Sequence, residues 1–351
     1  MTRSDGKNKQ YNKPWLSYAE QLDILKSRGL IVTDDSKARE YLQRIGYYRL
    51  SGYWFPFRQR SELCCILTSN WTGKKGKNHR IGHIALDEFK PGSCFQDAVE
   101  LYVFDKQLRL LVMDALERIE VAFRVDISHT LGKYGPFAYL EPERLFQDFA
   151  QAINQKTGIT DHQVWLQKQA QMINRSKEEF IRHNKEKYGL PLPIWIACEV
   201  WDFGTLSTLY DGMSQQDQDE ISSRYGISNG RVLASWLRSL NYLRNVCAHH
   251  SRLWNRNIVD QPKKPDKGEA PLFNQAWQPG QQHILARVFV LLCVIQHLLT
   301  TSNPNSSWWL RLKQLLQTFP DLTHLGLDLK GMGVMDGWGQ WSWPQTPKER
   351  Q

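Results

Sequence analysis

The sequence predicts an all-α protein, a helical bundle with a smaller N-terminal helical unit. Long segments carry apolar residues at steps of three and four, which is the repeat of an amphipathic helix. No stretch shows a convincing strand alternation of apolar and polar residues, and no internal repeat is visible. Successive helical segments without strands between them favour a bundle. We expect an N-terminal helical and aromatic unit with a basic loop over residues 1–90, a helical domain over 91–320, and an irregular tail over 321–351.

The composition is that of an ordinary globular chain, and its charge favours an anionic partner. The chain has 351 residues, enough for one large domain or two ordinary ones. A net charge of +9 is typical of proteins that bind nucleic acid, although it can also serve solubility alone. The six cysteines are scattered and form no Cys-x-x-Cys pair, which fits a reducing, cytoplasmic compartment rather than a disulfide scaffold.

Neither a signal peptide nor a membrane segment is expected. The opening residues are polar and lack an apolar core. The most apolar stretch, Ile284–Leu299, contains Arg287, Gln296 and His297. Its unbroken apolar part is too short to span a bilayer, so we expect a buried helix.

The N-terminal unit is expected to begin with two short helices. Apolar residues at helical spacing run from Leu16 to about Arg28, and Ser17 with Glu20 makes a capping box at the start. The second helix is expected over Ser36–Ile45, with an aspartate just before it as its cap.

Two segments of this unit suit RNA binding as well as a plain structural role. Tyr47–Arg58 is dense in aromatic residues and includes Arg49. Aromatic rings stack on bases, but they more often fill a core, and we favour the core here. Thr68–His83 is polar and basic, and we expect a loop that either contacts phosphate or is merely solvated. Its candidate phosphate contacts are Lys74, Lys75, Lys77 and Arg80.

The main domain is expected to consist of long helices. The strongest apolar periodicity covers Cys94–Leu131, and Gly135-Pro136 stops it. Further helices are expected over Val164–His183, from Trp195 until Gly204 bends or ends the helix, from Ser228 or Asn229 to about Trp254, over Ile284–Leu299, and over Trp308–Thr318. Glu199 and Asp202, which precede Gly204, either line a cleft or cap the bend.

The segment with the clearest chemical character lies at the end of the helix expected to finish at Trp254. From Arg244 it reads RNVCAHHSRLWNR. Asn245 and His249 are one turn apart and share a helix face, and the long side chain of Arg244 can reach the same place. Arg252 extends this polar face. The alternative is an ordinary helix end at which Arg and His complement the helix dipole.

These side chains suit cleavage of RNA by internal transesterification, in which the 2′-hydroxyl attacks the neighbouring phosphorus. His249 can carry the proton because histidine titrates near neutral pH. Arg244 can neutralise the charge on the phosphorane oxygens, and Asn245 can orient the imidazole or the phosphate. No metal is required, and DNA would be spared because it lacks the 2′-hydroxyl.

Other polar residues have both a functional and a structural interpretation. Arg124 and His129 repeat the spacing of the motif and can form a second site, but we interpret the pair as accidental or structural. Glu120 and Arg124 form either a helix salt bridge or a polar pair that faces His249 and sets its tautomer. The cysteine and histidines of the motif lack a second close ligand pair, so no metal or cofactor is expected. His250 is expected to support the site or to contact RNA.

At these residues the sequence also resembles a known family. RNVCAHHSRLWNR resembles the Arg-Asn-x-x-x-His signature of HEPN-domain ribonucleases, and more narrowly the Abi-like family (AbiD/AbiF type) linked to abortive phage infection. Arg244, Asn245 and His249 all match the signature. The resemblance runs from about residue 13 to about residue 320. Other stretches that resemble this family in the same order are KPWLSYAEQLDILKSRGL, YLQRIGYYRLSGYWFPFR, FDKQLRLLVMDALERIEVAFR, GPFAYL and KYGLPLPIWIACEVWDFGTLSTLY.

The resemblance implies a four-helix HEPN core and a metal-independent endoribonuclease of anti-phage defence, of the abortive-infection or toxin-antitoxin type. HEPN sites are usually composite, with two motifs meeting across a pseudo-twofold axis. One convincing motif in this chain therefore implies a homodimer. The partner implied is RNA, as the target and also as a structured noncoding RNA that some relatives bind. The alternative is a non-catalytic RNA-binding defence protein that holds such an RNA.

Overall fold

The computed structural model describes residues 12–67, 79–276 and 286–341. It confirms the prediction of a mostly helical protein. The chain divides into two compact units, which are described separately: residues 1–103 with 320–327, and residues 104–319 with 328–351. Helix α4 (Phe95–Gly132) is continuous through the boundary at residue 103, so it contributes to both units.

The first unit opens with the two helices that the sequence predicts. Helix α1 (Tyr18–Ser27) has the full capping box, because the Ser17 hydroxyl accepts from the Glu20 backbone N–H and the Glu20 carboxylate accepts from the Ser17 N–H. Helix α2 (Asp35–Arg44) is capped by the preceding aspartate. Helix α3 (Tyr47–Trp54) follows directly. Local capping chemistry was therefore enough to locate the first two helices.

Part of the aromatic segment after α2 fills the core of the first unit, whereas Tyr48 and Phe55 are 77% and 42% exposed. Tyr53, Trp54 and Phe57 are all buried. The Trp54 ring lies 5.9 Å from the ring of Phe95 at the start of α4. The core interpretation is confirmed for these residues, whereas Arg49 on the same helix is exposed.

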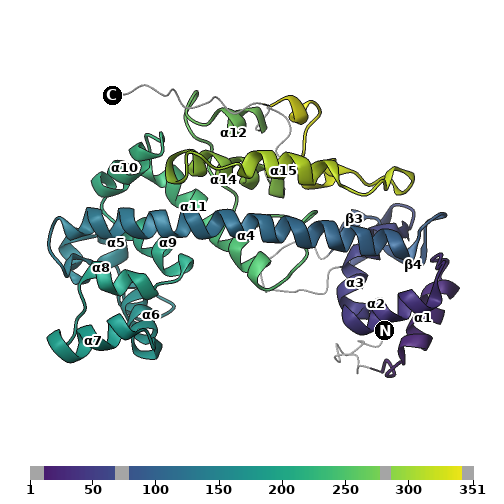
Figure 1. Cartoon of the computed structure of the whole chain (residues 1–351), viewed down its shortest axis with the longest axis horizontal. Helices are drawn as coiled ribbons and strands as arrows, with labels where there is room; N and C mark the ends of the chain where they lie inside the picture. Colours follow the sequence, from purple (N-terminus) through teal and green to yellow (C-terminus); the bar gives the residue numbers. More distant parts are fainter. Residues whose placement is uncertain (1–11, 68–78, 277–285, 342–351) are drawn as a thin grey trace, which may run out of the picture. The chain divides into compact units, whose positions relative to one another are not determined.

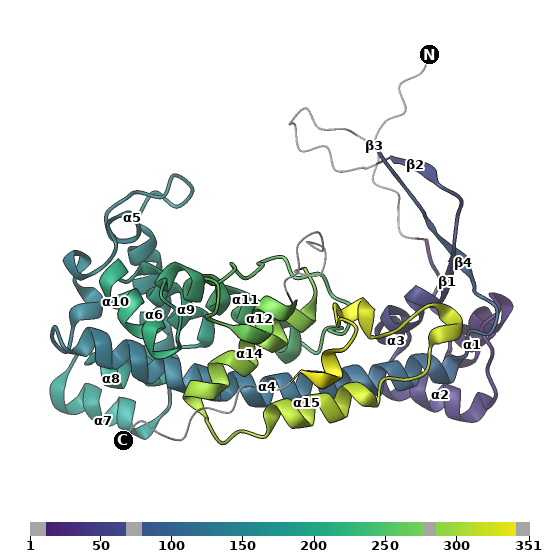
Figure 2. The ribbon, with the colours of Figure 1, turned by 90° about the horizontal axis from the view of Figure 1, so that it is seen from above.

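Four short strands lie in the first unit, in a region where the sequence showed no convincing strand alternation. Strand β1 (Arg58–Arg60) pairs antiparallel with β4 (Ala85–Phe89), and β2 (Cys64–Leu67) pairs antiparallel with β3 (His79–Gly82). Figure 2 shows β2 and β3 as a narrow two-stranded ribbon. Such short strands, mostly exposed where their side chains are described, lack a long alternating pattern. The loop expected there is thus partly a hairpin, and residues 68–78 lie outside the described parts.

The second unit contains the rest of α4 and a set of helices packed around it. Helix α14 is the buried helix that the sequence predicts, since every residue of Val288–Leu299 is buried. Helix α15 runs beside α4 (Figure 1), where the Trp308 indole N–H donates to the Leu111 carbonyl oxygen over 2.8 Å. The helices after α4 are α5 (Gln147–Ala150), α6 (Asp161–Arg175), α7 (Glu179–Tyr188), α8 (Ile194–Ala197), α9 (Phe203–Gly212), α10 (Gln215–Arg224), α11 (Gly230–Ala248), α12 (Pro271–Ala276), α14 (Val288–Ser302) and α15 (Trp308–Gln317).

Three of the predicted helix boundaries in this unit are wrong. The helix expected over residues 164–183 is split into α6 and α7, because Ser176 is extended and its hydroxyl accepts from the Glu178 N–H. The segment from Trp195 forms only short turns, and Gly204 lies in the first turn of α9 rather than at a helix end. Helix α11 stops at Ala248, before the predicted end at residue 254.

No helix in the described parts of the chain is both long and apolar enough to cross a membrane. All six cysteines are free thiols.

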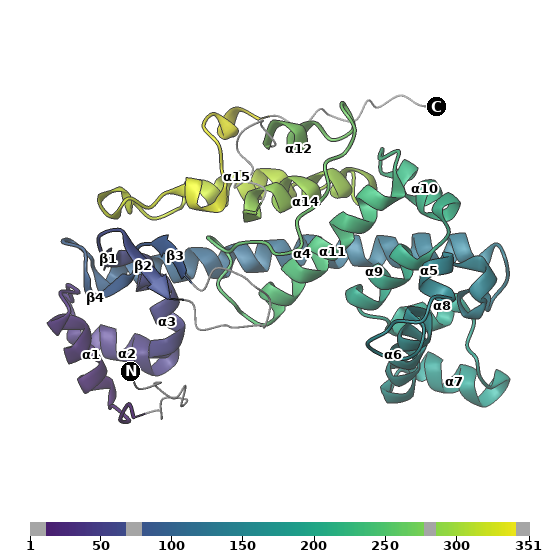
Figure 3. The same ribbon diagram turned by 180° about the vertical axis from the view of Figure 1, so that it is seen from behind.

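A buried ion pair explains why α11 ends early. The Asp105 carboxylate on α4 is fully buried and accepts hydrogen bonds from the backbone N–H groups of Leu253 and Trp254, at 3.1 and 2.7 Å. It also pairs with Arg109, whose guanidinium donates to the Ser251 carbonyl oxygen over 3.4 Å. N–H groups bonded to this carboxylate cannot continue the helical ladder. The Asp105–Arg109 pair therefore holds the segment that follows α11 against α4 (Figure 3).

Loss of the Asp105 carboxylate is expected to destabilise the protein strongly. Asp105→Ala leaves the Arg109 charge and two backbone N–H groups buried without their partner, so we expect a loss of about 3–5 kcal/mol in the free energy of unfolding. The matched control is Asp114→Ala on the same helix, which removes the partly exposed pairs with Arg118 and Arg311 and should lower stability by about 1 kcal/mol or less. Denaturant titration measures both values, and equal losses would contradict the structural role of Asp105.

Candidate active site

Helix α11 positions the motif that the sequence singles out. The Asn229 side chain caps its start by accepting from the Arg231 backbone N–H over 2.9 Å. One face is buried, and the other carries the half-buried side chains of Arg244 and Asn245. The buried apolar residues are those that the sequence placed on one face: Val232, Leu233, Trp236, Leu237, Leu240 and Leu243.

The three motif residues lie together at the C-terminal end of α11. The Arg244 guanidinium donates to the Asn245 amide oxygen over 3.3 Å. The backbone N–H of His249 donates to the Asn245 carbonyl oxygen over 3.0 Å, which places His249 one turn after Asn245 as the C-cap. His249 is exposed, and its imidazole makes no hydrogen bond to any residue that the structure describes. A free imidazole at the surface is available to accept or donate a proton.

The backbone after His249 is fixed by a complete Schellman motif. The His250 N–H donates to the Cys247 carbonyl oxygen and the Ser251 N–H to the Val246 carbonyl oxygen, over 3.0 and 2.9 Å. His250 has a φ of 55° and is the one residue other than glycine with a left-handed backbone in the described ranges. Glycine is usual at this position, because a Cβ there costs about 1–2 kcal/mol. This helix end therefore keeps a histidine in a backbone conformation that glycine adopts without that cost.

Helix α4 contributes an ion pair that faces α11. Arg124 pairs with Glu120 at 3.3 Å and donates to the Trp201 carbonyl oxygen over 3.2 Å. Burial raises the pKa of Glu120, and the positive charges of Arg124 and Arg244 oppose that rise. The influence of Arg244 places Glu120 close to the motif. No hydrogen bond joins Glu120 to His249 within the described residues, so the idea that Glu120 sets the imidazole tautomer has no support from this geometry.

The start of helix α9 borders the cluster formed by Glu120, Arg124 and Arg244. Asp202 caps the helix by accepting from the backbone N–H and the hydroxyl of Thr205, both at 2.7 Å, and it pairs with Lys168 at 3.1 Å. Gly204 allows a close approach to α11, because a Cβ there would lie 3.2 Å from the amide oxygen of Asn241. Asn241 was not predicted as part of the site, although it lies one turn before Arg244 and Asn245 on the same face.

The other residues that the sequence singled out lie beyond the motif, on other elements or outside the described residues. Arg252 is half-buried beyond the motif, and His129 is exposed at the end of α4. Arg49 belongs to the first unit. Of Arg80 only the backbone, in β3, is described. Outside the described residues lie Lys74, Lys75 and Lys77.

The described residues near the motif do not form a set of metal ligands. No group of three or more His, Cys, Asp or Glu residues in the described ranges is placed to hold a metal ion. Cys247 is buried, and burial raises the pKa of its thiol to about 12, which disfavours the thiolate that a metal requires. His249 and His250 are exposed instead.

The raised pKa of Glu120 predicts that the stability of the protein depends on pH, which can be tested. Because burial raises this pKa above its ordinary value of 4.5, the folded protein binds the proton more tightly than the unfolded chain does. The resulting stability is fully present below pH 4.5 and is lost as pH rises through the raised pKa. The wild type should therefore lose stability relative to Glu120→Gln over that range. Unfolding titrations of both proteins from acid to neutral pH measure this, and a constant difference would contradict it.

The strain at His250 can be measured by comparing two substitutions. His250→Gly and His250→Ala both remove the imidazole and its contacts, but only alanine keeps a Cβ in the left-handed conformation. We expect the glycine variant to be more stable than the alanine variant by about 1 kcal/mol. Denaturant unfolding of the two variants gives the difference, and an alanine variant as stable as the glycine variant would show that the backbone is not strained.

Comparison with known proteins was informative at the level of the family. The model of one family, described as Abi-like protein, matches residues 40–255, which is more than half of the 351 residues. The matched segment includes α4 and α11, and with them Glu120 and the motif that begins at Arg244. Comparisons with curated proteins and with solved structures gave no match. The chain therefore belongs to the Abi-like protein family, and this membership implies a role in abortive infection, a form of anti-phage defence.

Proposed function

We propose that this protein is a metal-independent endoribonuclease of the HEPN type, which acts on cytoplasmic RNA during anti-phage defence. The observation that carries the proposal is the end of α11, where an exposed imidazole lies one turn from a contacting Arg–Asn pair. The buried Asp105 carboxylate and the Schellman motif hold the backbone on the far side of His249. Catalytic groups held in this way need little reorganisation when the substrate binds.

The proposed reaction needs two proton transfers. The 2′-oxygen forms a bond to phosphorus while the bond from phosphorus to the 5′-oxygen breaks. One imidazole takes the proton of the 2′-hydroxyl, and a second, protonated group delivers a proton to the leaving 5′-oxygen. Arg244 neutralises the charge that develops on the phosphorane oxygens, and Asn245 keeps the guanidinium in place. The products are a 2′,3′-cyclic phosphate and a 5′-hydroxyl.

A homodimer would supply the second imidazole. Each chain carries one His249, so two copies offer a base and an acid from equivalent positions. Helix α4 exposes apolar side chains at Leu110, Val121 and Val125, which are 61%, 46% and 58% exposed. Their spacings of 11 and 4 residues place them on one face of the helix. An exposed apolar stripe on the helix that also carries Glu120 supports a second copy as the partner.

Removal of the imidazole is expected to abolish cleavage without affecting the fold. His249→Ala should slow cleavage of a mixed-sequence single-stranded RNA by about 100-fold or more, in the presence of a metal chelator. Stability should be unchanged, because the imidazole makes no hydrogen bond to the described residues. Gel electrophoresis of the products and thermal unfolding measure the two properties.

The matched control is His129→Ala. This histidine is also exposed, and it follows Arg124 at the same spacing as in the motif, so its loss should leave the cleavage rate unchanged. If the His249→Ala protein cleaves RNA at the full rate, the proposal that this site is a ribonuclease active site is wrong. A defence activity that persists in that variant would favour the alternative, an RNA-binding protein that acts without cleavage.

A further inference from the structure

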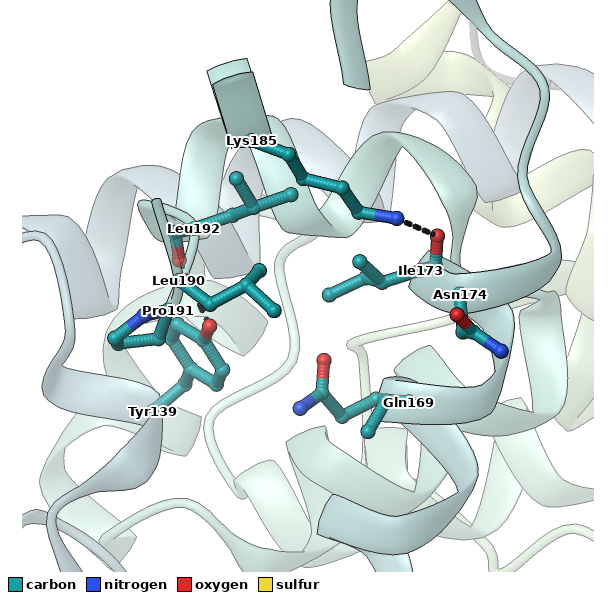
Figure 4. A pocket seen from close by; sticks show the side chains of 9 residues that line it. Tyr139, Gln169, Ile173, Asn174, Lys185, Leu190, Pro191 and Leu192 are labelled. Atoms are coloured by element: carbon teal, nitrogen blue, oxygen red, sulfur yellow. Dashed lines mark hydrogen bonds between the residues drawn. The ribbon is translucent and has the colours of Figure 1, made fainter. Parts of the chain in front are cut away.

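A cavity of about 350 Å³ lies in the second unit between α6, the end of α7 and the segment that follows α7 (Figure 4). This volume is within the range of sites for small organic ligands. Apolar groups form most of the wall, chiefly Ile173, Leu190, Pro191 and Leu192. Leu190 is 67% exposed, so the apolar surface continues to the mouth of the cavity.

One polar group inside the cavity lacks a partner. Gln169 of α6 is only 7% exposed, and its amide oxygen accepts no hydrogen bond from any described residue. Figure 4 shows this amide pointing into the cavity. A buried acceptor without a donor costs about 1–3 kcal/mol, so a ligand that supplies an N–H group there would recover this free energy. The amide lies at the wall of the cavity, and a small rotation of this side chain would bring its oxygen to an N–H group of a ligand.

A cation lies at the rim. The Lys185 ammonium donates to the Ile173 carbonyl oxygen over 2.7 Å, as Figure 4 shows. An ammonium has three N–H donors, so two remain to bind an anionic group at the mouth. The cavity thus combines apolar walls, one inward-facing amide and one cation at its edge.

We propose that this cavity binds a nucleobase, with the phosphate of the same nucleotide on Lys185. A base has apolar faces for the walls and an edge with N–H donors for the Gln169 oxygen, and amide side chains commonly read such edges. A purely apolar ligand would leave the Gln169 oxygen without a donor. A simple anion would meet mostly apolar wall. The base can belong to a free mononucleotide or to a base turned out of an RNA strand, since both present the same chemistry.

The wall of the cavity also reaches the candidate active site. The Tyr139 hydroxyl, which lines the cavity, donates to the Leu192 carbonyl oxygen over 2.8 Å. The Tyr139 ring lies 5.6 Å from the ring of Trp201, and the Trp201 carbonyl oxygen accepts from Arg124. A chain of contacts thus links the wall of the cavity to Arg124. Binding itself requires no cleavage, so the inference goes beyond the proposed function.

Equilibrium binding tests the inference in the His249→Ala background, which separates binding from catalysis. The probes are the four ribonucleoside monophosphates, ribose 5-phosphate, and a 2′-O-methyl RNA oligonucleotide of mixed sequence. The test variant is Gln169→Leu, and the matched control is Gln171→Leu, an exposed glutamine on the same helix that does not line the cavity. A second variant, Ala170→Trp, fills the mouth without removing the amide.

We expect Gln169→Leu and Ala170→Trp to weaken binding of a probe that contains a base by about tenfold or more, which corresponds to the loss of one buried hydrogen bond. The control should bind as before, and ribose 5-phosphate should not bind. Thermal unfolding of Gln169→Leu should be unchanged or shifted upward, because an apolar side chain of similar size replaces an unsatisfied amide. If Gln169 had a purely structural role, the Gln169→Leu substitution would instead lower the unfolding temperature.

Each outcome separates the possibilities. Binding of a monophosphate that depends on Gln169 identifies a free nucleotide as the ligand. Binding of the oligonucleotide alone, with the same dependence, identifies a base of an RNA strand. If no probe binds at millimolar concentration, or if Gln169→Leu binds as well as Gln171→Leu, the proposal is wrong. None of these results depends on whether His249 is catalytic.

Discussion

The end of α11 depends on a buried carboxylate in the second unit. Asp105 on α4 binds two backbone N–H groups beyond the end of α11 and pairs with Arg109, which in turn holds the Ser251 carbonyl oxygen. Burying a charge is favourable only when hydrogen bonds and an opposite charge compensate for lost hydration, and here both are present. This arrangement ends α11 at Ala248 and fixes the chain that leaves the motif. The position of His249 follows from it.

The candidate active site combines opposite charges at the meeting of three elements. Arg124 and Glu120 come from α4, Asp202 from the start of α9, and Arg244 from α11. The raised pKa of Glu120 shows that its carboxylate is not fully compensated by the two guanidinium groups. An incoming phosphate would compete with Glu120 for Arg244, and uptake of a proton by Glu120 would reduce that competition. In the proposed reaction, the carboxyl group would therefore adjust the charge of the site when RNA arrives.

Much of the fold could be predicted from the sequence because its signals are local. The capping box of α1 involves residues three apart, and the apolar repeat of α4 continues over many turns. The end of α11 could not be predicted, since it is set by Asp105, which lies 148 residues before its hydrogen-bond partner Leu253. The motif at Arg244 was visible because its residues share one helix end. Asn241 and the cavity at Gln169 were missed, since both depend on helices packing against distant segments.

The central claim is that the side chains at the end of α11 promote attack by an RNA 2′-hydroxyl on the neighbouring phosphorus. The most direct test uses a DNA oligonucleotide that contains one ribonucleotide, incubated with the wild-type protein in the presence of a metal chelator. We predict cleavage only on the 3′ side of that ribonucleotide, with a 2′,3′-cyclic phosphate and a 5′-hydroxyl identified by mass spectrometry. Cleavage between deoxyribonucleotides, or a 5′-phosphate at the cut, would contradict this account.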